Sequence, residues 1–286
     1  MQTYRPQADS IWVKNRLRQA FTPFVQRWRD HTAREAAQFI PLNFLDGAMG
    51  HVAALALPSV RLALSKAGFD CTLQDNALHV RWPGVAEQLP AALGTLAQGL
   101  RHAGLVKGWR NELQAVLAHT DETLGGLERS TFKTLGLRSR AVHVHVQTPG
   151  GLIWVGVRAK TKHENPGMLD NLAAGGVAFG ESVSSTVLRE LHEEAGLTQN
   201  DLEWVKPMGT AELTVSRPLP HGDWHHETLY LYRAQTKAGV CPNNLDGEVA
   251  KFQLMTASAC AAAINQWAFT PDAALCTALA ITESQE

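Results

Sequence analysis

The sequence predicts an α/β protein, in which a mixed sheet in the second half is preceded by a small α+β region. Three observations support this prediction. The chain of 286 residues is nearly twice as long as a typical single domain. Apolar residues alternate at 141–148, as they do in strands. A helical pattern follows a glycine-rich loop at 182–195. We therefore expect two domains, an accessory α+β domain at 1–120 and a second domain at 121–286.

The first half alternates between helical and strand-like patterns. Apolar residues recur at spacings of three and four from Ile11 to Phe39 and are interrupted by Pro23, which predicts two helices that meet near this proline. Short or alternating apolar runs at 40–57 and 76–82 predict strands, and patterns at 58–67 and 86–103 predict helices. The polar, glycine-containing stretch at 119–126 marks the expected domain boundary.

The second half has mainly strand patterns. The run at 150–158 follows the Pro149-Gly150-Gly151 turn, so we expect it to form a hairpin with 141–148. Later strands are expected at 209–215 and 227–233, and a further helix at 256–267. Together these elements predict a mixed sheet as the core of this half.

Composition and charge exclude several classes of protein. The chain carries 26 Lys and Arg against 27 Asp and Glu, and 45% of its residues are hydrophobic, which argues against a disordered chain. The formal charge of −1 argues against binding to nucleic acid or to an anionic membrane. This average conceals a basic half, with a net charge of +5 at 1–120, and an acidic half, with −6 at 121–286.

Four separate cysteines form no C-x-x-C pair, which favours a reducing compartment, and we expect a cytoplasmic protein. Residues 48–60, the most apolar stretch, are too short to span a bilayer. Residues 1–34 are Arg-rich and acid-poor, as transit peptides are, although Trp12, Phe21, Phe24 and Trp28 equally match the buried face of a helix. The sequence leaves the formation of a homodimer open.

Residues 175–197, GGVAFGESVSSTVLRELHEEAGL, hold the most informative charge pattern, and we name them the acidic segment. Glu190, Glu193 and Glu194 are spaced i, i+3 and i+4, so they share one face of a helix. Val187, Leu191 and Ala195 form a neighbouring apolar stripe that can pack on a sheet. We expect Ser182 to cap the start of this helix and Gly196 to follow its end.

Three carboxylates on one helical face repel one another, so this arrangement favours a counter-charge. Hard divalent cations with oxygen ligands, Mg²⁺ or Mn²⁺, would supply it. The alternative interpretation is a solvated acidic face, which is the common one for an isolated E-x-x-E-E helix.

The complete acidic segment resembles the signature of the Nudix hydrolases, G-x5-E-x7-R-E-U-x-E-E-x-G-U, where U is a bulky apolar residue. Gly175 to Leu197 match every specified position. The resemblance implies an α/β/α sandwich with a mixed sheet. It also implies that water cleaves a small-molecule diphosphate linked to another moiety, with Mg²⁺ or Mn²⁺ as cofactor.

The resemblance also implies roles for single residues of the acidic segment. Glu190, Glu193 and Glu194 would bind the metal, with the carbonyl of Gly175 as a further ligand. Arg189 would orient the glutamates, and Glu181 would brace the loop.

A general base must lie near the attacking water, and the signature alone does not identify it. The candidates are Glu193, Glu212, Glu227 and Glu248. Glu248 is the preferred distal candidate because it lies in an acidic turn before a predicted strand, although a plain exposed turn carboxylate is the alternative.

The resemblance extends to WRNEL at 109–113, to 127–137, to 154–176 and to 246–255. These stretches resemble a Nudix subgroup with an N-terminal domain of unknown function, related to a module of fungal thiamine pyrophosphokinases. The subgroup implies hydrolysis of thiamine diphosphate, or of its damaged oxo and oxy forms, to the monophosphate. ADP-ribose, coenzyme A and other nucleoside diphosphate derivatives remain alternative substrates.

Several residues outside the acidic segment are candidates for substrate contact. Arg158 and Lys162, with Lys160 as a weaker candidate, follow a predicted strand and are expected near a substrate phosphate, with a solvated strand end as the alternative. Four aromatic side chains are candidates to stack on a substrate ring, with packing in the core as the alternative: Trp109, Trp154, Trp224 and Tyr230. The histidine groups lack a convincing zinc spacing; they comprise His143 with His145, and His221, His225 and His226 beside Asp223.

The sequence argues against two other functions. Isopentenyl diphosphate isomerase, a relative of the Nudix proteins, needs a catalytic cysteine just before the acidic segment, and DNLAAGG at 170–176 contains none. A catalytically silent diphosphate-binding module is disfavoured by the intact Glu190, Glu193 and Glu194.

Overall fold

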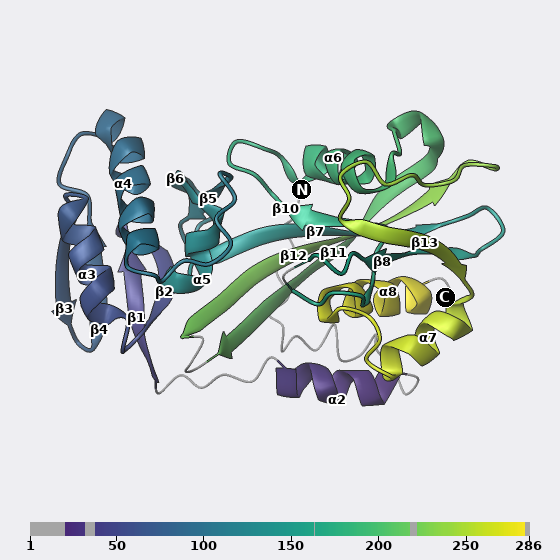
Figure 1. Cartoon of the computed structure of the whole chain (residues 1–286), viewed down its shortest axis with the longest axis horizontal. Helices are drawn as coiled ribbons and strands as arrows, with labels where there is room; N and C mark the ends of the chain where they lie inside the picture. Colours follow the sequence, from purple (N-terminus) through teal and green to yellow (C-terminus); the bar gives the residue numbers. More distant parts are fainter. Residues whose placement is uncertain (1–20, 32–37, 163, 218–221, 284–286) are drawn as a thin grey trace.

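The computed structural model describes residues 21–31, 38–162, 164–217 and 222–283. They form a smaller α+β unit beside a larger unit in which helices cover both faces of a mixed sheet (Figure 1). The predicted fold class is therefore confirmed.

The central sheet of the larger unit has five strands in the order β11 (Leu202–Arg217), β12 (Asp223–Thr236), β7 (Arg138–Gln147), β8 (Ile153–Arg158), β13 (Val249–Met255). Two short strands extend it, since β9 (Leu169–Asp170) pairs with β8 and β10 (Ala173–Gly176) pairs with β7. Strands β12 and β7 run parallel and the other pairs are antiparallel, so the sheet is mixed as predicted. The expected hairpin forms, with Val146 opposite Trp154.

Helix α6 (Val183–Ala195) covers one face of this sheet, and α2 (Thr22–His31), α7 (Ala257–Asn265) and α8 (Pro271–Glu283) cover the other (Figure 1). Val142, Val144 and Val146 of β7 face α6, while the alternating partner Ala141 faces α8. The period of two in the sequence of β7 thus separates two buried cores, one on each side of the sheet.

The predicted pair of helices around Pro23 is only partly described. Helix α2 begins at Thr22 and places Pro23 in its first turn, where a missing N–H costs no hydrogen bond. Residues before Phe21 lie outside the described part of the chain. The prediction is wrong at Phe39, which begins strand β1 and pairs with Ala53.

The smaller unit packs helices α3 (Leu57–Lys66) and α4 (Leu89–His102) on a four-stranded sheet. The strand order is β2 (Ala48–Ala53), β1 (Phe39–Phe44), β4 (Ala77–Arg81), β3 (Asp70–Gln74). The predicted strands and helices of this region are therefore present. A hairpin of β5 (Leu113–Leu117) and β6 (Thr123–Glu128) and the short helix α5 (Phe132–Leu135) complete the same core.

The expected boundary between residues 120 and 121 falls in the turn that joins β5 to β6. Val116 and Leu127, on opposite sides of this turn, both belong to the core of the smaller unit, as does Leu137. A cut at 120 would separate two hydrogen-bonded strands. The division into two domains stays a prediction, and this packing favours a boundary near Leu137.

In the described part of the chain, no helix combines the length and hydropathy that a bilayer span requires. The cytoplasmic location stays a prediction.

A close backbone approach packs the end of α5 on strand β2. Gly136 follows α5 in the left-handed region, at φ 61°, and a Cβ there would overlap the backbone of His51 in β2. Gly50 of the same strand lies equally close to the carbonyl of Leu135. Only glycine allows this approach at both positions.

We expect Gly136→Ala to lower the free energy of unfolding by clearly more than the cost of about 1 kcal/mol that a left-handed residue carries by itself. Gly151→Ala is the matched control, because its φ is 78° and a Cβ there would meet nothing within 4 Å. Urea unfolding of both variants measures the difference. Equal losses in the two variants would show that the contact with His51 is unimportant.

Candidate active site

Helix α6 of the acidic segment begins and ends where the sequence predicts. The Ser182 hydroxyl accepts a hydrogen bond from the backbone N–H of Ser185, and the Ser185 hydroxyl accepts one from the N–H of Ser182, which makes a capping box. Gly196 ends the helix in the left-handed conformation, at φ 64°. Val187, Leu191 and Ala195 are buried against the sheet, as expected from their spacing.

The three glutamates of α6 differ in burial. Glu190 and Glu194 are buried, with relative exposures of 7% and 8%, while the side chain of Glu193 is 48% exposed. The buried pair, spaced i and i+4, faces strand β10, and the backbone N–H of Ala174 donates to Glu194 Oε2 at 2.8 Å. A Cβ at Gly175 would overlap the carboxylate of Glu190, so glycine is needed for the close packing of this carboxylate on β10.

Arg189 holds the acidic segment together. Its Nε and Nη2 donate to the two carboxylate oxygens of Glu181 at 3.0 Å each, a bidentate pair. Its Nη1 donates to Glu190 at 2.7 Å and to Glu193 at 2.9 Å, and Nη2 also donates to the carbonyl of Gly176 at 3.0 Å. These contacts match the orienting role expected for Arg189 and the bracing role expected for Glu181. They also raise the pKa of Arg189 although burial opposes this, so its charge is permanent.

Arg189 does not fully compensate the negative charge of the buried carboxylates of Glu190 and Glu194. Burial raises the pKa of Glu190, and the charge of Arg189 only partly offsets it. Burial raises the pKa of Glu194 well above its usual value, and the nearby charges of Asp170 and Glu190 raise it further. Three carboxylates are thus close together in a region where water screens them poorly. Such an arrangement fits a bound cation.

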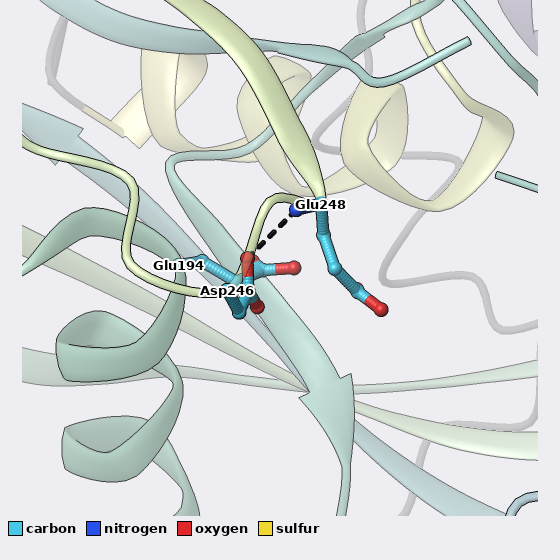
Figure 2. Close-up of side chains that lie close together, drawn as sticks. All are labelled: Glu194, Asp246 and Glu248. Atoms are coloured by element: carbon cyan, nitrogen blue, oxygen red, sulfur yellow. Dashed lines mark hydrogen bonds between the residues drawn. The ribbon is translucent and has the colours of Figure 1, made fainter. Parts of the chain in front are cut away.

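Glu194 lies beside the loop that precedes β13. Its carboxylate, Asp246 and Glu248 each present an oxygen, and these oxygens all lie within 4.8 Å of one another (Figure 2). We name these three residues the acidic cluster. The backbone N–H of Glu248 donates to Asp246 Oδ1 at 2.8 Å, which fixes the loop (Figure 2).

The composition of the acidic cluster suits a hard divalent cation, because such ions take carboxylate oxygens as ligands. Sequence reasoning missed Asp246. The available signal was its position in the turn NNLDGEV, two residues before Glu248, since turn carboxylates at i and i+2 can approach one ion. The contact with Glu194 joins segments far apart in the chain and depends on the fold.

Residues 137–273 match the family model described as the NUDIX domain. This segment is a Nudix domain.

The chain also matches curated relatives. The chain is 28% identical to Nudix hydrolase 20, chloroplastic, of Arabidopsis thaliana over 187 residues, which is 64% of this chain and 49% of that protein. It is 28% identical to Nudix hydrolase 24, chloroplastic, of the same plant over 191 residues, 65% of this chain and 51% of that protein. The chain thus spans about half the length of these relatives.

Among solved structures, the chain is similar to DR0079 from Deinococcus radiodurans. The TM-score is 0.44 at 18% identity, over 56% of this chain and 92% of that chain.

The two cationic residues that the sequence predicts for phosphate contact lie beside the acidic cluster, and their contact with a phosphate stays a prediction. Arg158 Nη1 donates to Asp170 at 2.7 Å, and its other nitrogens donate to the carbonyl of Glu164. The ammonium of Lys162 pairs with the carboxylate of Glu248. Lys160 is exposed. Burial opposes a low pKa for Glu248, but the hydrogen bond from Lys162 and the charges of Lys162, Arg110 and Arg158 lower it.

The other two distal candidates for the general base have partners of their own. Glu227 accepts from Ser139 at 2.8 Å, and the charge of His225 outweighs burial and lowers the pKa of Glu227 to about 2. Glu212 accepts from Thr228 at 2.8 Å and lies 3.2 Å from His226 Nε2. Neither residue belongs to the acidic cluster.

The aromatic candidates have packing roles. Trp224 stacks on His51 with ring centroids 3.9 Å apart, and Arg101 lies over the ring of Trp109. Trp154 and Tyr230 pack against the core on the α6 side of the sheet.

The histidine candidates do not gather at one point. His143 and His145 are buried on the face that α8 covers; His143 Nδ1 lies 3.1 Å from Asn171 Oδ1, and burial lowers the pKa of His145 to about 4. His221 lies outside the described residues. His225 and His226 lie in strand β12, where they contact Glu227 and Glu212 instead of the acidic cluster.

The variant Glu194→Gln is expected to be at least as stable as the wild type when metal is removed. The raised pKa of Glu194 means that the folded state binds its proton more tightly than the unfolded chain does. The free energy of unfolding of the wild type should therefore fall as the pH rises from the pKa of Glu194 in the unfolded chain towards its higher pKa in the folded protein. The variant has no carboxyl group at this position, so it should not show this fall. The amide oxygen of Gln can still accept from Ala174.

Urea unfolding between pH 4.5 and 8 in the presence of a chelator measures this effect. Glu203→Gln, at an exposed glutamate, is the control. A variant that is less stable than the wild type at every pH would contradict the crowding of negative charge at Glu194.

Proposed function

We propose that this chain hydrolyses a diphosphate linked to an organic group in a reaction that depends on Mg²⁺ or Mn²⁺. The observation that carries this proposal is the acidic cluster, in which buried Glu194 meets Asp246 and Glu248 beside the cations Arg158 and Lys162. The names of the two plant relatives, which are called Nudix hydrolases, support the same reaction class.

Glu194 and Asp246 would hold the ion, and Glu190 and Glu193, oriented by Arg189, would complete its surroundings with the carbonyl of Gly175. Such a cation would neutralise phosphate oxygens and lower the pKa of a bound water. Arg189 meanwhile keeps the carboxylates of Glu190 and Glu193 in fixed positions by hydrogen bonds.

The phosphates would lie between the acidic cluster and the two cationic side chains. Arg158 keeps a fixed orientation because Asp170 and the Glu164 carbonyl hold its guanidinium. Lys162 would exchange its contact with Glu248 for a phosphate oxygen, which would free the carboxylate of Glu248 to accept the proton of the attacking water. We therefore retain Glu248 as the proposed general base.

Thiamine diphosphate or its oxo and oxy analogues are the proposed substrates, with the monophosphate as product. This choice rests on the subgroup that residues 109–113, 127–137 and 246–255 resemble. ADP-ribose and coenzyme A are the alternatives, because they carry the same diphosphate chemistry with a different organic group.

A product assay on these five compounds with Mg²⁺ tests the reaction and the substrate together. We expect phosphate release from the thiamine compounds, and we expect Glu194→Gln to lower kcat by about 10³-fold, the scale of losing a main electrostatic contact. Glu203→Gln should retain the wild-type rate. Equal rates in the wild type and Glu194→Gln would contradict the proposed function, and selective cleavage of ADP-ribose or coenzyme A would redirect the substrate.

The role of Glu248 can be separated from metal binding. If Glu248 is the base, Glu248→Gln should lower kcat by about 100-fold or more while Mn²⁺ affinity changes little. Asp246→Asn is the comparison, because it should weaken Mn²⁺ binding. A parallel loss of Mn²⁺ affinity and activity in Glu248→Gln would assign Glu248 as a ligand and not as the base.

A further inference from the structure

The smaller unit pairs through its backbone with the loop between β10 and α6, residues 177–182. The backbone N–H of Phe179 donates to the carbonyl of Leu113 at 2.8 Å, and Gln114 forms an antiparallel bridge with Ala178. Strand β5, which pairs with β6 along one edge, therefore pairs with this loop along its other edge.

Two side chains of the smaller unit also cover the end of β10. Gln114 is 2% exposed, and a Cβ at Gly176 would overlap its amide. The same Cβ would lie 3.1 Å from Cζ of Arg129, which follows β6. Arg129 is held in turn by Glu112, because its backbone N–H donates to the Glu112 carbonyl at 2.8 Å and its Nη1 donates to the carboxylate at 3.1 Å. The smaller unit thus fixes the position of Gly176 by close packing.

The ring of Phe179 makes a further contact between the loop and the smaller unit. A Cβ at Gly126 of β6 would lie 2.9 to 3.1 Å from three atoms of this ring, which is closer than side chains normally pack. The ring therefore rests directly on the backbone of β6, and any side chain at position 126 would push it away.

From Gly176 the contacts continue to the carboxylates of α6. The carbonyl of Gly176 accepts from Arg189 Nη2 at 3.0 Å, and Nη1 of the same arginine holds Glu190 and Glu193. The carboxylate of Glu190 packs in turn on Gly175. Gly176 thus lies between the smaller unit and the arginine that orients two glutamates, so a shift of Gly176 would move these groups as well.

The contact of Gln114 with Gly176 is one of shape. Its Oε1 is buried and has no hydrogen-bond partner among the residues that the structure describes. Replacing a buried polar group that lacks a partner by an apolar group of the same shape costs little or nothing. Methionine has a similar length, so it should support Gly176 as well as glutamine does, whereas alanine would leave a gap.

We propose that the smaller unit positions the metal-binding part of the Nudix domain and that Gln114 is the positioning residue: by packing on Gly176 it keeps Arg189, Glu190 and the carbonyl of Gly175 in the arrangement that receives the cation. This inference rests on the proposed function for the presence of the cation. It gives the smaller unit a supporting role in the site that requires no contact with the substrate.

The inference is tested on the full chain with the wild type, Gln114→Ala, Gln114→Met and Val60→Ala. Val60 is the matched control, because it is fully buried in the core of the smaller unit but lies on α3, away from β10 (Figure 1). Two quantities are measured: the affinity for Mn²⁺, by electron paramagnetic resonance, and the rate of hydrogen exchange at the backbone amide of Phe179, by nuclear magnetic resonance without metal.

We expect Gln114→Ala to raise the Kd for Mn²⁺ by about tenfold, the lower end of the range for residues that support metal ligands. Exchange at Phe179 should be faster in this variant, because the loop opens more often. Gln114→Met should match the wild type in both measurements. Val60→Ala should lower the free energy of unfolding but leave the Mn²⁺ affinity and the exchange at Phe179 unchanged.

Wild-type Mn²⁺ affinity in Gln114→Ala would overturn the inference. An equal loss of affinity in Val60→Ala would overturn it as well, since the loss would then follow the stability of the smaller unit. An equal loss in Gln114→Met would contradict positioning by packing. Thermal unfolding checks that each variant is folded. If Gln114→Ala is not folded, Gly126→Ala replaces it, because its Cβ would displace Phe179 and should weaken Mn²⁺ binding in the same way.

The failure of the proposed function would be seen separately. If the wild type binds no Mn²⁺ and cleaves no diphosphate, the proposed reaction fails. Faster exchange at Phe179 in Gln114→Ala alone would then still support the positioning of the loop by the smaller unit, and equal exchange in all four proteins would overturn it.

Discussion

The negative charge buried between α6 and β10 is the constraint on which the rest of the site depends. A hydrophobic helix face must pack on the sheet, and the same turns of α6 carry Glu190 and Glu194 into the protein with it. Burying carboxylates costs free energy unless they are paired. Arg189 supplies one cation to Glu181, Glu190 and Glu193, and the N–H of Ala174 supplies one donor to Glu194. A divalent cation would supply the remaining charge.

The surroundings of this charge explain why separate parts of the chain meet here. Glycines at 175 and 176 let the carboxylate of Glu190 and the side chain of Gln114 approach the backbone of β10 from two sides. The first contact comes from α6 and the second from the smaller unit. Strand β10 is therefore contacted by both units.

The sequence predicted those parts of the structure that depend on local patterns. The period of two in β7, the caps at Ser182 and Gly196, and the stripe of Val187, Leu191 and Ala195 follow from neighbouring residues, and all are present. Helix α8 was not predicted, because its residues are apolar on nearly all sides and give no helical periodicity. Its burial between the sheet and α7 depends on the complete fold.

The same distinction applies to the site. The sequence predicts that the glutamates of α6 share one face, because residues at i, i+3 and i+4 are neighbours on any helix. The distance of Asp246 from Glu194 depends on how the loop before β13 is placed, and no local pattern contains it. The assignment of Glu190, Glu193, Glu194 and Gly175 as metal ligands, and of Arg158 and Lys162 as phosphate ligands, stays a proposal that their positions support.

Direct titration with Mn²⁺, followed by electron paramagnetic resonance at neutral pH, tests the central claim that the carboxylates around Glu194 require a cation. The account predicts saturable binding to the wild type, weaker binding to Asp246→Asn and loss of the tightest site in Glu194→Gln. Binding of Mn²⁺ with the same affinity and stoichiometry to the wild type and to Glu194→Gln would contradict it.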